Sequence, residues 1–106
     1  MKTVVYALIA ASLVIFYDPT PTMAGPISNA CMKSDRKAKS RKLCSCMQAV
    51  ANQELSRRDQ KLAASFFKDP QKAQDIRQSD KHSNEQFWKR YKKFGATFSR
   101  SCGHLG

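Results

Sequence analysis

Apolar residues recur at intervals of three and four along most of this chain, and no stretch shows the strict alternation of a β-strand. The clearest case lies near the end of the chain, where the intervals are four, three, four and four: Phe87, Tyr91, Phe94, Phe98 and Cys102. On a helical wheel these positions fall within about 80° of one another. The pattern predicts a long helix that starts after an N-cap at Ser83, ends before Gly103 and turns an aromatic stripe towards the core.

Three shorter helices are predicted before the aromatic one. The first begins between residues 35 and 40 and ends near residue 54. The second starts after Ser56, which forms a capping-box pattern with Asp59. A third, short helix over residues 71–78 follows Pro70, because proline is favoured at the first helical position. We therefore expect an all-α fold, a small bundle of about four short helices.

The first 24 residues differ from the rest of the chain. Lys2 precedes the apolar run Val4–Tyr17, and the small residues of Thr22-Met23-Ala24 follow, as in a secretory signal peptide that is cleaved before Gly25. A membrane-spanning helix needs about 20 apolar residues, and this run is shorter. We expect an exported protein, in the periplasm or outside the cell. Its parts would be the signal peptide (1–24), an irregular segment (25–34) and the helical domain (35–106).

The four cysteines are expected to form disulfide bonds, because an exported domain of this size is too small to be stabilised by its core alone. A Cys44–Cys46 bond is disfavoured within a helix, because side chains two residues apart point about 200° apart. Either Cys31 pairs with Cys44 and Cys46 with Cys102, or the partners are exchanged; we favour Cys46 with Cys102. The alternative is a copper(I) site that combines the thiolates with methionines and His104. The even count and the compartment favour two disulfides, so no cofactor or metal is predicted.

Positive charge is in large excess, with 19 Lys and Arg against 8 Asp and Glu and a net charge of +11. Removal of the signal peptide takes away one lysine and one aspartate and leaves that charge unchanged. Two basic clusters stand out: Lys33, Arg36, Lys37, Lys39, Arg41 and Lys42, and then Lys89, Arg90, Lys92, Lys93 and Arg100. Such an excess attracts polyanions. We predict non-catalytic binding to an anionic envelope lipid, lipopolysaccharide or an acidic macromolecule, with a merely solvated charged face as the alternative.

Catalytic patterns are missing from the sequence. It contains no nucleophile elbow, phosphate-cradling glycine loop or His-Glu-x-x-His helix. Neither of its histidines, His82 and His104, has an acid at a spacing that suggests a dyad. Glu54 falls at the centre of an apolar helix face, where a small hydrolase-like enzyme would place a catalytic acid. We expect it instead to pair with Arg57 or Arg58 or to cap the next helix, and we predict that the protein is not an enzyme.

Several spaced motifs carry a resemblance to a known family. They are Leu43–Gln48, Leu55–Arg57, Ala63–Pro70, Lys72–Gln74, Arg77–Asp80 and Phe87–Gly95. Together they resemble a family of small exported proteobacterial proteins that often carry the label "arginine transporter", over roughly residues 43 to 103. The resemblance implies a role accessory to arginine transport as an alternative function and supplies no functional residues. A permease would need spanning helices, which the mature chain is not expected to contain.

Overall fold

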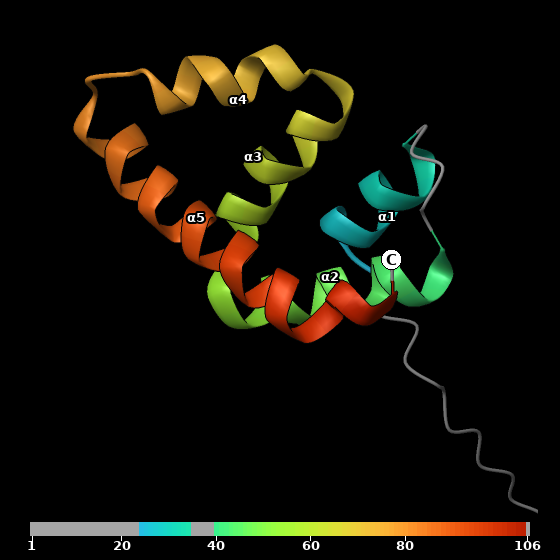
Figure 1. The fold of residues 1–106 in the computed structure, drawn as a ribbon. Coiled ribbons are helices and arrows are strands. Elements are labelled where there is room, and N and C mark those ends of the chain that lie inside the picture. The colour runs from blue at the N-terminus through green and yellow to red at the C-terminus, as the bar shows by residue number, and fades with distance from the viewer. Residues whose placement is uncertain (1–23, 35–39, 106) are drawn as a thin grey trace, which may run out of the picture.

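The computed structural model describes residues 24–34 and 40–105, and every regular element in these ranges is helical (Figure 1). The elements are α1 (Pro26–Lys33), α2 (Arg41–Glu54), α3 (Arg57–Lys68), α4 (Pro70–Arg77), α5 (His82–Cys102) and the 3₁₀ turn η2 (Gly103–Leu105). The predicted all-α class is confirmed. Apart from Ala24, the predicted signal peptide lies outside the described residues, as do Arg36, Lys37 and Lys39 of the first basic cluster.

Residues 26–33 form α1, so the expectation of an irregular segment over 25–34 is wrong. The first turn of α1 is capped from another helix: the Gln48 side-chain oxygen accepts hydrogen bonds from the backbone N–H groups of Ile27 and Ser28, both at 2.9 Å. The Ser28 hydroxyl in turn accepts from the backbone N–H of Gly25 at 3.1 Å. The cap that α1 needs is therefore supplied in part by a residue 20 positions away in sequence.

The other helix starts follow local capping rules with one exception. Ser40 and Ser56 each accept a hydrogen bond from the third residue of their helix, at 3.0 and 3.1 Å. The cap at Ser56 is the one that the sequence predicts. Pro70 is the first residue of α4. The prediction of Ser83 as the N-cap of α5 is wrong, because the N-cap is Lys81, two residues earlier: the carbonyl of Lys81 accepts from the N–H of both Asn84 and Glu85, each at 3.0 Å.

The helices pack around α2, which contacts both α1 and α5, while α1 also contacts α3. α4 connects the ends of α3 and α5 that lie far from α2 (Figure 1). Two disulfides fasten this arrangement: Cys31–Cys44 joins α1 to α2, and Cys46–Cys102 joins α2 to the end of α5. The favoured pairing is confirmed. Because all four cysteines are bonded, they offer no thiolate to a metal, and the copper alternative falls.

The aromatic stripe of α5 faces the core, as predicted. Phe87 and Phe94 are almost fully buried, whereas Tyr91 and Phe98 are half-buried at the edge of the core. Phe66 of α3 meets the stripe edge-on, with its ring centroid 5.2 Å from that of Tyr91. Edge-to-face contacts of this kind add to the stabilisation from buried apolar area. They hold α3 against α5.

Candidate functional site

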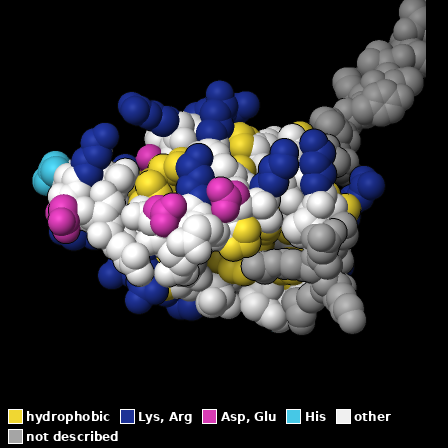
Figure 2. Space-filling view, turned by 90° about the horizontal axis from the view of Figure 1, so that it is seen from above, with side chains coloured by type: hydrophobic (Ala, Val, Ile, Leu, Met, Phe, Trp, Pro, Cys, Tyr) yellow, Lys and Arg dark blue, Asp and Glu magenta, His cyan; other side chains and the backbone are white. Residues whose placement is uncertain are grey.

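The structure describes part of the first predicted basic cluster and all of the second. Of the first cluster, the structure describes Lys33 at the end of α1 and Arg41 and Lys42 at the start of α2. Four of the exposed basic residues of α5 share one face about 100° wide: Lys89, Lys92, Lys93 and Arg100. Figure 2 shows lysine and arginine side chains along several edges of one side of the molecule, with few acidic side chains among them. On this side of the molecule, positive charge among the described residues is therefore distributed over several edges.

Arg90 is also exposed on α5, but its guanidinium is paired with a carboxylate of the protein itself. Its Nε and one terminal nitrogen donate to the two carboxylate oxygens of Asp59, at 2.6 and 3.1 Å. Asp59 is buried at the start of α3, so this paired contact holds α3 to α5. The hydrogen bond, together with the charge of the carboxylate, raises the pKa of Arg90 above its usual value. Of the predicted anion-binding residues, Arg90 is therefore already occupied by an internal anion.

Glu54 also faces α5, which corrects the expectation that it pairs with Arg57 or Arg58. It accepts a hydrogen bond from the Thr97 hydroxyl at 3.0 Å, and the Lys93 ammonium lies 3.6 Å from its other oxygen. Both histidines are exposed. Among the described residues, no group of three or more His, Cys, Asp and Glu could hold a metal ion. Glu54 thus anchors the C-terminal half of α5 to α2.

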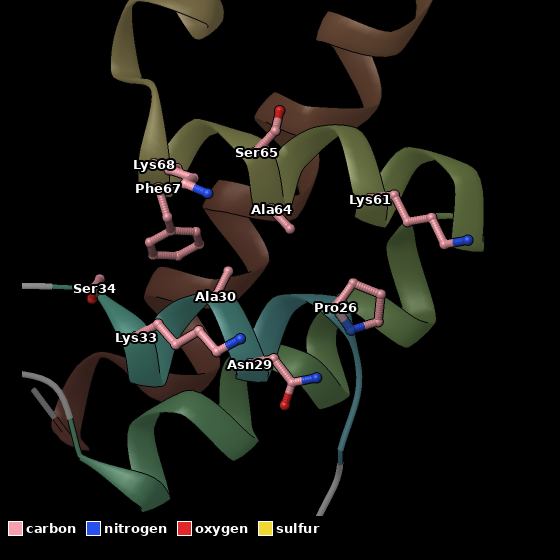
Figure 3. Close-up of a pocket in the computed structure, with 10 residues that line it drawn as sticks. All are labelled: Pro26, Asn29, Ala30, Lys33, Ser34, Lys61, Ala64, Ser65, Phe67 and Lys68. Carbon is pink, nitrogen blue, oxygen red and sulfur yellow. The ribbon is translucent and has the colours of Figure 1, made fainter.

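A groove of about 420 Å³ lies between α1 and α3 (Figure 3). Lys33 reaches it from α1, and Lys61 and Lys68 reach it from α3, where their spacing of seven residues places them on the same face. Ala30 and Ala64 keep the space between the two helices open, because their side chains are short. None of the residues that line the groove is acidic.

The groove lysines have no acidic partner within the part of the chain that the structure describes, where Arg90 and Lys93 form the only ion pairs. Figure 3 shows Lys33 and Lys68 towards one end of the groove and Lys61 towards the other, and three lysines along one concavity create a positive potential that favours anions. Asn29, exposed on the rim, adds a neutral hydrogen-bond donor. The arrangement suits a phosphate or carboxylate group with several negatively charged oxygens.

Lys61 and Lys68 were absent from the predicted anion-binding set. Both sit in sequence stretches where charge is mixed, so local charge density gives no signal for them. Their seven-residue spacing on a helix was visible in the sequence. What the sequence did not show is that α1 exists and lies beside α3, and without α1 there is no groove.

None of the helices in the described ranges is both long and apolar enough to cross a membrane. Comparison of the chain with protein-family models, with curated proteins and with solved structures found no match. The lysine side chains of the groove and of the exposed surface are therefore the basis for a functional proposal.

Proposed function

We propose that this chain is a non-catalytic binding protein for anionic groups and that the α1–α3 groove is its principal contact. The observation that carries the proposal is that Lys33, Lys61 and Lys68 all line one concave surface and that no acidic residue lines it. The net charge of +11 supports it, because long-range attraction brings anions to the protein before any contact forms. The exposed face of α5 with Lys89, Lys92, Lys93 and Arg100 contributes to that attraction.

The predicted signal peptide narrows the class of partner. For an exported protein the abundant anions are the phosphate and carboxylate groups of envelope lipids and lipopolysaccharide, so we take a phosphate-bearing envelope lipid as the partner. Arginine itself is a poor ligand for this groove, because its guanidinium would lie against three ammonium groups. The resemblance to proteins labelled "arginine transporter" would then reflect shared ancestry and not arginine binding.

Binding of the oxidised protein to lipid vesicles tests the proposal. Vesicles of phosphatidylcholine with and without phosphatidylglycerol are sedimented with the protein over a range of salt concentrations. We expect binding only to the anionic vesicles, with an affinity that falls as salt rises, because exposed charges are screened. No binding, or binding that is indifferent to salt, contradicts the proposal.

A pair of charge-matched variants separates the groove from net charge. The triple variant Lys33→Gln, Lys61→Gln and Lys68→Gln removes the groove cations and is expected to bind at least about tenfold more weakly. The control is the triple variant Lys72→Gln, Arg77→Gln and Lys81→Gln, which removes three exposed cations in and beside α4 and should lose less than about threefold. Equal losses in the two variants would show that net charge alone attracts the membrane.

A further inference from the structure

A second hollow, apolar in character, lies next to the lysine groove. It has a volume of about 260 Å³ and is lined mainly by aromatic side chains, among them Phe67, Trp88 and Phe98. These three rings are half-buried, so the hollow opens to the surface. Lys92 is its only charged lining residue. A hollow of this composition favours an apolar group.

Gly95, in the middle of α5, keeps this hollow open. A Cβ atom added at Gly95 would meet no heavy atom within 4 Å. Glycine within a helix is less stable than alanine, because its backbone loses more conformational freedom on folding. At Gly95 that cost is not offset by the close approach of another helix. The missing side chain leaves space among the rings instead.

Phe67 connects the two hollows, because it lines both the apolar hollow and the lysine groove. Figure 3 shows its ring between α1 and α3, at the end of the groove where Lys33 and Lys68 also lie. A positively charged concavity and an aromatic concavity thus meet at one side chain. A ligand that spans them needs an anionic head and an apolar chain.

We propose that the two hollows form one binding site for a monomeric, single-chain anionic amphiphile such as a long-chain alkyl phosphate. The head group lies among the groove lysines, and the chain passes Phe67 to lie beside Trp88 and Gly95. The head-group end of this site rests on the proposed function, whereas the apolar end does not. Charge complementarity selects the occupant: a cationic amphiphile would place its head against Lys33 and Lys68, and a small anion would leave the apolar hollow empty.

Trp88 is the only tryptophan in the chain and lines the apolar hollow, so its fluorescence reports occupancy. The oxidised protein is titrated with dodecyl phosphate below its micelle concentration. We expect a saturable blue shift of Trp88 emission, and the same affinity by isothermal titration calorimetry. Inorganic phosphate should leave the emission unchanged, and dodecyltrimethylammonium should bind at least about tenfold more weakly.

The variant Gly95→Leu tests the apolar end of the site, because the leucine side chain fills the apolar hollow without removing a contact. We expect the affinity for dodecyl phosphate to fall at least about tenfold while the far-ultraviolet circular dichroism stays that of the wild type. Ala96→Leu is the control, since Ala96 is exposed on the same helix and its substitution should leave the affinity unchanged. The double variant Lys33→Gln, Lys68→Gln should weaken dodecyl phosphate binding and make it less sensitive to salt than that of the wild type.

The outcomes separate this inference from the proposed function. Lysine-dependent vesicle binding without a Trp88 response to dodecyl phosphate would overturn the amphiphile site and leave the proposed function standing. Equal binding of dodecyl phosphate and dodecyltrimethylammonium would also overturn it, since the lysines would then play no part. A folded Gly95→Leu variant with wild-type affinity would show that the chain does not enter the hollow.

Discussion

Gln48 of α2 and Gln60 of α3 are joined inside the core by a hydrogen bond of 2.7 Å from the Gln48 amide nitrogen to the Gln60 oxygen. Both side chains are buried, with exposed fractions of 1% and 5%. The amide nitrogen of Gln60 in turn donates to the carbonyl oxygens of Ala51 and Leu55, at 3.3 and 3.2 Å. Since Gln48 also caps α1, one polar network joins three helices. No buried side-chain nitrogen or oxygen in the described residues lacks a partner.

Gln48→Ala is expected to destabilise the protein by about 2–4 kcal/mol. The substitution leaves a cavity and removes the acceptor for the N–H groups of Ile27 and Ser28, which then remain buried without a partner. Urea unfolding followed by circular dichroism measures the loss. Gln53→Ala, on the exposed side of the same helix, makes the same change in helix propensity and should shift stability by less than about 0.5 kcal/mol. Similar losses at both positions would contradict the structural role of Gln48.

Substitution of two glycines by alanine should change the stability of the protein in opposite directions. A Cβ at Gly25 would lie 2.6 Å from both Cδ and Oε1 of Gln48. Gly25→Ala therefore displaces the Gln48 side chain from the first turn of α1 and should destabilise the protein by about 1–3 kcal/mol. Gly95→Ala meets open space within a helix and should stabilise by about 0.5–1 kcal/mol. Thermal unfolding of the two variants checks the signs. A stabilising Gly25→Ala would mean that Gln48 moves aside without loss.

The two disulfides should differ in what they protect. Replacement of Cys31 and Cys44 by alanine removes about 3 kcal/mol on the loop-entropy model and releases α1, a helix of only 8 residues. Hydrogen exchange should then accelerate at the α1 amides more than in α5. Replacement of Cys46 and Cys102 opens a loop of 56 residues and should cost about 4 kcal/mol, with faster exchange throughout the protein. Uniform acceleration in both variants would indicate that α1 is not a separate unit of stability.

The contact between Arg90 and Asp59 should show measurable coupling. In a double-mutant cycle with Arg90→Gln and Asp59→Asn, we expect about 1–2 kcal/mol, because the carboxylate is buried and receives two hydrogen bonds. The Lys93 and Glu54 pair is the matched control. Its lysine side chain is 74% exposed and the atoms are 3.6 Å apart, so a cycle with Lys93→Gln and Glu54→Gln should give less than about 0.5 kcal/mol. Equal coupling energies in the two cycles would argue against the anchoring role of Arg90.

Local features were predicted well, because the interactions that decide them lie within a few residues. Ser56 caps α3 through the N–H three residues on, so the start of α3 follows from a short pattern. Ser40 caps α2 in the same way, although the sequence pattern places that start only between residues 35 and 40. The start of α5 was wrong because Ser83 matches a capping pattern that the chain does not use. The expectation of an irregular segment over residues 25–34 was wrong for a different reason. The first turn of α1 is capped by Gln48, a residue of another helix, and such a cap leaves no pattern within residues 25–34.

The sequence by itself determined the helical class, the aromatic side of α5 and the need for two disulfides. Periodicity, apolar content and an even cysteine count are properties of the chain that can be read without knowing which residues meet in space. Only the tertiary structure decided the use of individual polar residues. Arg90 looks like its basic neighbours until Asp59 is seen beside it. Lys33, Lys61 and Lys68 form a groove only once α1 lies against α3. Charge is a property of the chain, but a binding site requires that side chains distant in sequence meet in space.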